Sequence, residues 1–139
     1  MIWRKEHSLE ELNEIFGRYM TGYLDIKASN IQPEYLEATM PISDKVLQPF
    51  GILHGGASVV LAESIGSIAS ALLIDTEKYN AVGLEINANH LRPGKRGVVR
   101  AKCSPIHLGR TTHVWDIKIH DEKNRLLCVS RLTVAIIKK

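Results

Sequence analysis

The sequence predicts an α+β domain in which an antiparallel sheet of about six strands wraps around one long central helix. The helix, expected over about 55–74, consists almost entirely of small and apolar residues. The segments after it alternate, are rich in β-branched residues and are separated by turns: 81–91, 98–108, 112–120 and 126–137. Because the helix is apolar all round, we expect the sheet to bury it on nearly every side.

The first third of the chain predicts one short helix and two strands. Ser8 and Glu11 have the spacing of a capping box in front of an amphipathic segment with apolar residues at Leu9, Leu12, Ile15 and Phe16. We expect residues 17–22 to break this helix, and extended segments to follow at about 24–31 and 35–41. A loop with Gln48, Pro49 and Gly51 then leads to the long helix.

Length and composition indicate one domain, 1–139, with 45% hydrophobic residues and a scattered net charge of +3. No run of Lys and Arg alternates with aromatic residues, so we expect no nucleic-acid partner. The apolar tract 57–74 is interrupted by serines and Glu63, which argues against a membrane span. The first residues have no apolar signal segment, so we expect a cytoplasmic protein. Cys103 and Cys128 are expected to be free buried thiols, and no histidine spacing predicts a metal site.

Glu63 lies in the middle of the apolar helix and is the first candidate for chemistry. On a period of 3.6 residues it shares a stripe of small and polar residues with Gly56, Val59, Ser67 and Ser70. Such a stripe leaves room for a ligand or for a closely packed neighbouring helix. The carboxylate itself could be exposed, could pair with an arginine across an interface, or could act in catalysis, and the residues alone leave these interpretations about equal.

The start of the same helix is a second candidate. At His54, Gly55 and Gly56 the first backbone N–H groups have no partner within the helix, and the helix dipole is positive there. Such a helix start can polarise a carbonyl group as an oxyanion hole does. Glu63 follows Gly55 by eight residues, or about 12 Å along the axis. One substrate carbon cannot touch both, so joint action of the two requires a second subunit.

Three motifs resemble the hotdog-fold acyl-CoA thioesterases over essentially the whole chain. They are "QPFGILHGGASVVLAESIGS" (48–67), "GLEINANHLRP" (83–93) and "PIHLGRTTHVWDIKIHDEKNRLLCVSRLT" (105–133). The similarity is greatest to the branch that acts on aromatic acyl-CoAs, which includes the 1,4-dihydroxy-2-naphthoyl-CoA thioesterases of menaquinone synthesis and the proofreading thioesterases of the enterobactin pathway. The resemblance implies a hotdog fold that forms dimers and commonly tetramers.

The resemblance also implies roles for individual residues. Glu63 would be the nucleophile or general base, and His54 and the Gly55 N–H would bind the thioester carbonyl. Gln48 would help to hold the carbonyl or the attacking water, and Ser67 would bind water or the acyl group. The expected substrate and CoA-binding residues are Gly83, His90, Leu91, Arg92, Pro93, His107, Leu108, Gly109, Arg110, Thr111 and Thr112.

The expected reaction is hydrolysis of an aromatic acyl-CoA thioester, with no metal and no cofactor other than the CoA of the substrate. A thiolate leaves easily, so a carboxylate suffices either as nucleophile or as base for water. A carrier-protein thioester is a further candidate substrate. Val59, Ile68 and Leu72 are candidates for the acyl pocket. Two alternatives remain: a hotdog hydratase or dehydratase, and a non-catalytic acyl-CoA-binding module.

Overall fold

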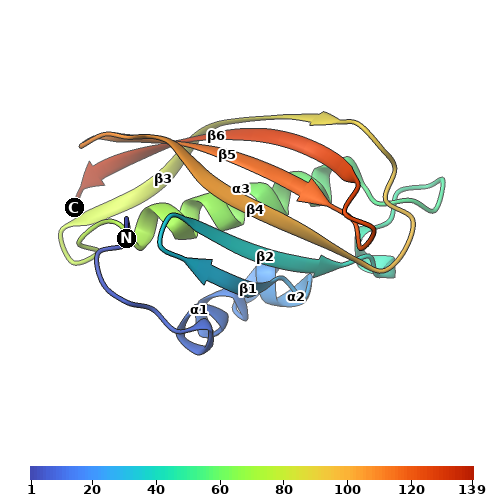
Figure 1. The fold of residues 1–139 in the computed structure, drawn as a ribbon, viewed down its shortest axis with the longest axis horizontal. Helices are drawn as coiled ribbons and strands as arrows, with labels where there is room; N and C mark the ends of the chain where they lie inside the picture. Colours follow the sequence, from blue (N-terminus) through green and yellow to red (C-terminus); the bar gives the residue numbers. More distant parts are fainter.

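A six-stranded antiparallel sheet curls over one long helix in the computed structural model, which describes the whole chain, residues 1–139 (Figure 1). The strand order is β1-β2-β4-β5-β6-β3. The elements are α1 (Leu9–Phe16), α2 (Tyr19–Tyr23), β1 (Lys27–Gln32), β2 (Tyr35–Pro41), the 3-10 turn η1 (Asp44–Val46), α3 (Gly55–Ala71), β3 (Tyr79–His90), β4 (Val98–Leu108), β5 (Thr112–His120) and β6 (Leu126–Lys138). The predicted α+β class and the wrapped central helix are confirmed.

The core lies between α3 and the concave face of the sheet. Trp115, Ile117 and Ile119 alternate on β5 with half-buried or exposed residues and are fully buried against the helix. Small residues on α3 let the strands approach closely. At Gly66, for example, an added Cβ would lie 2.5 Å from the Leu132 side chain. Burial of this interdigitated apolar surface is the main stabilising term of the fold.

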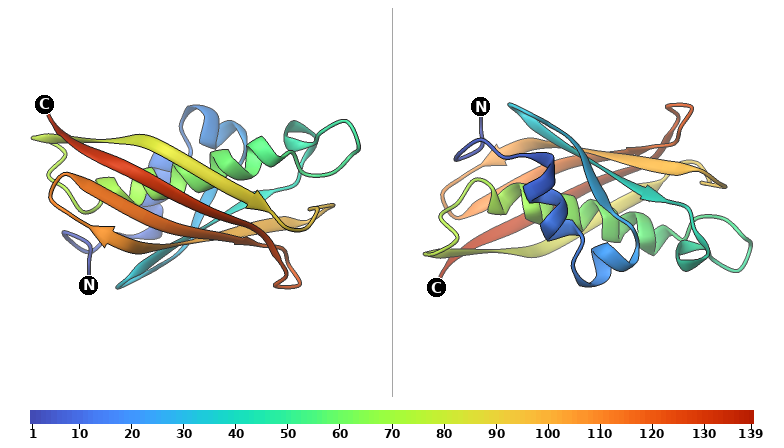
Figure 2. Two further views of the ribbon diagram at one scale, coloured as in Figure 1. Left: turned by 90° about the horizontal axis from the view of Figure 1, so that it is seen from above. Right: turned by 90° about the horizontal axis from the view of Figure 1, so that it is seen from below.

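The N-terminal segment closes the side of α3 that the sheet leaves open (Figure 2). The capping box is present: the Ser8 hydroxyl accepts from the Glu11 N–H at 3.1 Å, and the Ser8 N–H donates to the Glu11 carboxylate at 3.2 Å. Asn13 joins α1 to β1, because its side chain bonds both the N–H and the carbonyl of Ala28. Trp3 stacks on Trp115 with 6.4 Å between ring centroids.

Two predicted boundaries are wrong by three residues each, and one short helix was not predicted. The long helix ends at Ala71 instead of 74, since the N–H groups of Leu73 and Ile74 bond carbonyls three residues back, which tightens the last turn. The first strand begins at Lys27, not 24. Residues 17–22 do break the first helix, which ends at Phe16, but a second short helix that was not predicted, α2, begins at Tyr19 with a φ of +53°.

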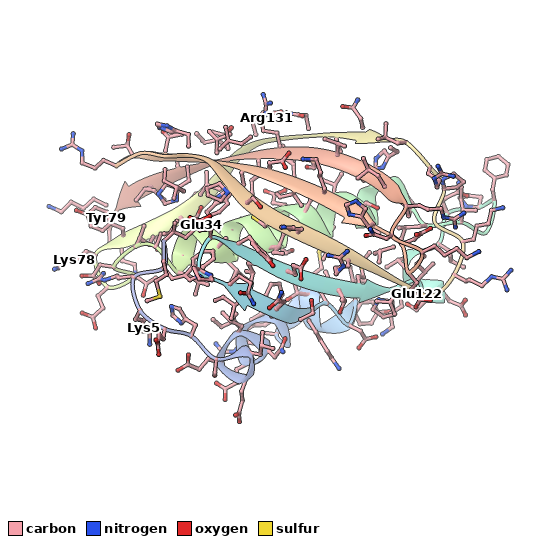
Figure 3. The ribbon with its side chains drawn as sticks, viewed as in Figure 1. Lys5, Glu34, Lys78, Tyr79, Glu122 and Arg131 are labelled. Atoms are coloured by element: carbon pink, nitrogen blue, oxygen red, sulfur yellow. The ribbon has the colours of Figure 1, made fainter.

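The two ends of the sheet carry different loops. At one end, β3 begins at Tyr79 and β4 turns into β5; at the other, β3 ends at His90 and Glu122 lies in the β5–β6 turn (Figure 3). β3 is an edge strand, so one side of its twelve-residue backbone has no partner within the chain. None of the helices has the length and apolar character needed to cross a membrane.

Candidate active site

Glu63 lies half-buried in the middle of α3, against β3. Its carboxylate packs on the Gly83 backbone, where an added Cβ would lie 2.6 Å from Glu63 Oε1. The side chain makes no hydrogen bond and no ion pair within the chain. An ion pair within this chain therefore does not explain why a glutamate lies in this apolar helix. Gly83, one of the predicted substrate- and CoA-binding residues, leaves the space that the carboxylate occupies.

The start of α3 presents a free backbone donor. His54 is the N-cap residue, and its Nδ1 accepts from the Gly56 N–H at 2.8 Å, so the ring carries its proton on Nε2. The Gly55 N–H has no acceptor within the chain. A side chain at Gly55 would meet His90, whose Nε2 would lie 2.8 Å from an added Cβ. The helix start therefore offers one unpaired N–H at its positive end, flanked by two imidazoles.

Gln48 lies in the loop that leads into α3. Leu47 and Leu53 pair as an isolated bridge and close this loop, and Gly51 adopts a φ of +76° within it. The Gln48 side-chain oxygen accepts from the Phe50 N–H, which leaves the amide nitrogen free to donate. The local turn thus fixes the oxygen of Gln48 and keeps a donor available.

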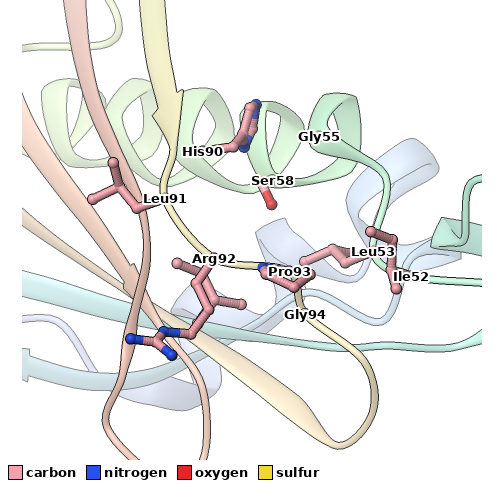
Figure 4. A pocket seen from close by; sticks show the side chains of 10 residues that line it. Ile52, Leu53, Gly55, Ser58, His90, Leu91, Arg92, Pro93 and Gly94 are labelled. Carbon is pink, nitrogen blue, oxygen red and sulfur yellow. The ribbon is translucent and has the colours of Figure 1, made fainter.

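A pocket of about 350 Å³ lies beside the helix start (Figure 4). Four of the predicted CoA-binding residues line it together with Gly55: His90, Leu91, Arg92 and Pro93. The sequence did not identify its other lining residues, Ile52, Leu53, Ser58, Gly94 and Leu127. Helical spacing could have found Ser58, which lies one turn after Gly55. Leu127 depends on the pairing of β3 with β6, which no local pattern encodes.

The second predicted CoA-binding segment, residues 107–112, lies at the opposite end of the sheet. On β6, Cys128 pairs with His90 while Ala135 pairs with Thr112. These two positions are seven residues apart, or about 24 Å along the strand. At this end Gly109 packs against His107, whose Nε2 would lie 2.7 Å from an added Cβ, and Arg110 and Thr111 are exposed. One chain therefore does not bring the two segments together.

The expectation that α3 is buried on nearly every side is only partly correct. Glu63 and Ser67 remain half-buried, whereas Ser70, predicted on the same stripe, is fully buried. The strands cross the helix obliquely because the sheet is twisted (Figure 2). The same helix face therefore meets β3 at Glu63 and β5 at Ser70. Leu72, a candidate for the acyl pocket, is buried at the far end of the helix beside Leu12 and Arg4.

A buried polar network below β5 was not predicted from the sequence. Ser70 Oγ accepts from Trp115 Nε1 at 2.8 Å and lies 3.1 Å from His113 Nδ1. Burial lowers the pKa of His113 below its ordinary value of 6.5, and the Gly109 backbone partly offsets this. Cys103 and Cys128 are free and buried, as predicted. No three His, Cys, Asp or Glu side chains gather where they could hold a metal ion.

Comparison with known proteins identifies the family. A family model described as "Thioesterase superfamily" matches residues 50–128, more than half of the chain. The chain belongs to the thioesterase superfamily. The predicted family, the hotdog fold and thioester hydrolysis as its activity are therefore confirmed.

Relatives from this superfamily match the chain over nearly its whole length. It is 55% identical over 137 residues to a 1,4-dihydroxy-2-naphthoyl-CoA hydrolase from Escherichia coli (strain K12), covering 99% of this chain and 100% of that protein. It is 44% identical to the proofreading thioesterase EntH of Cronobacter sakazakii, with 99% of each chain covered. A mutant thioesterase from Pseudomonas aeruginosa superposes with a TM-score of 0.97 at 47% identity, covering all of both chains.

Proposed function

We propose that the protein hydrolyses aromatic acyl-CoA thioesters, with 1,4-dihydroxy-2-naphthoyl-CoA as the leading substrate, at a site that two subunits share. The observation that carries the proposal is the pair of unpaired groups on α3: the half-buried Glu63 carboxylate and the Gly55 N–H. The first can attack or activate water, and the second can hold the oxyanion. Full-length identity of 55% to a hydrolase of that substrate supports the acyl group.

The proposed chemistry requires no group beyond this chain and water. The thioester oxygen accepts from the Gly55 N–H at the positive end of α3, and the free amide nitrogen of Gln48 assists. By one route a Glu63 oxygen bonds to the carbonyl carbon, CoA leaves as the thiolate, and water hydrolyses the mixed anhydride. By the other, Glu63 takes a proton from water while the water oxygen bonds to that carbon and the same C–S bond breaks. Ser67, one turn after Glu63, holds the water or the acyl group.

The free edge of β3 supports a shared site. If two copies of β3 pair antiparallel about a two-fold axis between Ile86 and Asn87, Gly83 lies opposite His90 of the partner subunit. Glu63 packs on the first of these residues and Gly55 on the second, so each acid would face the helix start of the other subunit. Two such dimers would associate further into a tetramer.

The same pairing would join the two CoA-binding segments. The turn at 109–112 lies two strands from β3, at the end where Gly83 is found. His90–Pro93 of the partner subunit would reach this end. Arg92 and Arg110 would then approach one ligand from different subunits, and each can bind phosphate oxygens. A CoA thioester, anionic at its nucleotide end, fits this arrangement.

Thiol release from a panel of thioesters tests the proposal. The panel consists of 1,4-dihydroxy-2-naphthoyl-CoA or a stable analogue, benzoyl-CoA, a hydroxybenzoyl thioester on a carrier protein and an aliphatic acyl-CoA. We expect preference for an aromatic CoA ester, and loss of turnover in Glu63→Ala and Glu63→Gln with the fold intact. If Glu63→Ala kept most of the turnover, the assigned role would be wrong. CoA-ester binding without turnover would favour a binding module, and hydration of an enoyl-CoA would favour a hydratase.

The two routes for Glu63 differ in a trappable intermediate. Hydroxylamine or borohydride added during turnover modifies the Glu63 side chain only if a mixed anhydride forms. Mass spectrometry of the peptide that contains Glu63 then distinguishes nucleophile from base.

A further inference from the structure

The pocket beside the start of α3 contains a hydroxyl group that has no partner in the chain. Ser58 lies one turn after Gly55 and lines this pocket. The residue is 3% exposed, yet its side chain makes no hydrogen bond with any other group of the protein. A buried hydroxyl costs free energy unless it is hydrogen-bonded, so Ser58 needs a partner from outside the chain.

The Ser58 oxygen is accessible from the pocket. Fully enclosed polar atoms without a partner occur elsewhere in the chain, in the side chains of His7, Ser43 and His120, but Ser58 Oγ is not one of them. Figure 4 shows its hydroxyl pointing from α3 into the pocket. A ligand in the pocket can therefore reach this group.

The other walls of the pocket indicate which part of the substrate passes Ser58. Gly55, whose free N–H we assign to the thioester carbonyl, and Arg92, which we assign to the phosphates, line the same pocket. The part of a CoA ester between these two groups is the pantetheine arm, in which methylene groups alternate with amides. Leu53 and Leu127 give the pocket apolar walls for the methylenes. Its volume of about 350 Å³ is small for a ligand site and suits a slender chain.

The spacing along α3 selects one of the two amides of this arm. Ser58 follows Gly55 by three residues, a rise of about 4.5 Å, and its Cβ is tilted back toward the helix start. In a CoA thioester the sulfur and two methylene carbons separate the carbonyl carbon from the nearer amide nitrogen, a span of about 5 Å at ordinary bond lengths. The second amide nitrogen lies about twice as far away. The position of Ser58 therefore matches the nearer amide.

We propose that Ser58 binds the first amide of the pantetheine arm and so favours thioesters that carry an amide at this position. This inference rests on the proposed function, which places the thioester carbonyl at the Gly55 N–H. A hydroxyl both donates and accepts, so Ser58 can bond the amide N–H or the amide carbonyl. Because it touches the thiol side of the substrate, Ser58 contributes to recognition of every acyl group alike.

Three benzoyl thioesters that differ only in the thiol test the proposal. Benzoyl-CoA has the whole arm, the N-acetylcysteamine thioester ends after the first amide, and the S-pentyl thioester has methylenes in place of that amide. Loss of one neutral hydrogen bond in Ser58→Ala should lower kcat/KM for the first two esters alike, by about threefold to tenfold. Hydrolysis of the S-pentyl ester should be unchanged.

Two control variants separate this contact from effects on the fold. Ser58→Cys keeps nearly the same volume with a much weaker hydrogen-bonding group and should behave as Ser58→Ala does. Ser70 is also a buried serine of α3, but its hydroxyl accepts from Trp115 Nε1 at 2.8 Å. We expect Ser70→Ala to lose stability while the ratio of kcat/KM between the N-acetylcysteamine and S-pentyl esters stays at the wild-type value.

The same series distinguishes failure of the inference from failure of the proposed function. An equal loss for the N-acetylcysteamine and S-pentyl esters in Ser58→Ala, a loss confined to benzoyl-CoA, or no loss for any ester would overturn the role of Ser58, although the wild type remains a thioesterase. If the wild type hydrolyses none of the three esters, the proposed function is wrong and the inference is wrong with it.

Discussion

Replacing Gly83 with alanine is expected to impair catalysis with little effect on folding. An added Cβ would lie 2.6 Å from Glu63 Oε1 and 3.9 Å from the Leu132 side chain. Ordinary contact begins at 3.4 Å, so the carboxylate oxygen must retreat by about 0.8 Å, which a flexible side chain does at small cost. A reacting group misplaced by about 1 Å can cost about 100-fold in rate. We therefore expect kcat/KM to fall about 10- to 100-fold, or about 1.4–2.8 kcal/mol in the barrier.

Gly66→Ala is the matched control, because its Cβ would lie 2.5 Å from Leu132 in the core and does not reach Glu63. Overpacking there should cost about 1–3 kcal/mol of unfolding free energy while the folded enzyme keeps its kcat. The assay is thiol release alongside chemical denaturation. Glu63→Asp shortens the acid and should remove most of the additional effect of Gly83→Ala. Unchanged kcat/KM in Gly83→Ala, or an equal loss in both glycine variants, would refute this reasoning.

Three further predictions concern stability and pH. His54→Ala removes the acceptor for the Gly56 N–H and should lower the unfolding free energy by about 0.5–2 kcal/mol in a denaturant titration. His54→Asn retains a capping side chain and should keep most of this stability. Equal losses of unfolding free energy in the two variants would contradict a capping role for His54. Asn13→Ala leaves the Ala28 N–H and carbonyl without their partner and should lower the unfolding free energy by about 1–3 kcal/mol. Asn13→Asp keeps the acceptor for the Ala28 N–H, so it should lower the unfolding free energy by less, and the difference measures the contribution of the N–H contact. No change in either variant would contradict the link between α1 and β1. Burial lowers the pKa of His113, so the unfolded chain binds the proton more readily than the folded protein does. The unfolding free energy should therefore decrease as pH falls below about 6.5. His113→Asn should flatten this pH dependence, and an unchanged slope of unfolding free energy against pH would contradict the prediction.

Local patterns were sufficient to predict most elements. The alternation of β-branched residues predicted the observed bounds of β4 and β5. The capping box at Ser8 correctly predicted the start of α1. These features depend on residues close together in the sequence. α2 was missed because Tyr19 adopts a positive φ that no neighbouring residue predicts. The helix end at Ala71 was missed because apolar residues continue past it into the core.

The relative positions of site residues required the tertiary structure. Whether Ser70 faces solvent or Trp115 depends on the angle at which the strands cross α3, which helical spacing does not contain. The separation of His90 from Thr112 follows from strand order and register. The sequence did indicate that Glu63 and Gly55 are too far apart to act within one helix, since that distance follows from helix geometry alone.

The central claim, a site shared between two subunits, is tested most directly by mixing two inactive variants. Glu63→Ala removes the acid. Gly55→Pro removes the free N–H at the first helical position, whose backbone suits proline, and its Cβ also displaces the His90 ring, which lies beside the same helix start. Each variant alone should be inactive. In a shared site, a mixed dimer has one active site with both defects and one with neither, so refolding equal amounts together should restore about a quarter of wild-type kcat. If the mixture stays as inactive as its components, although mixed dimers form, each site lies within a single chain and the account is wrong.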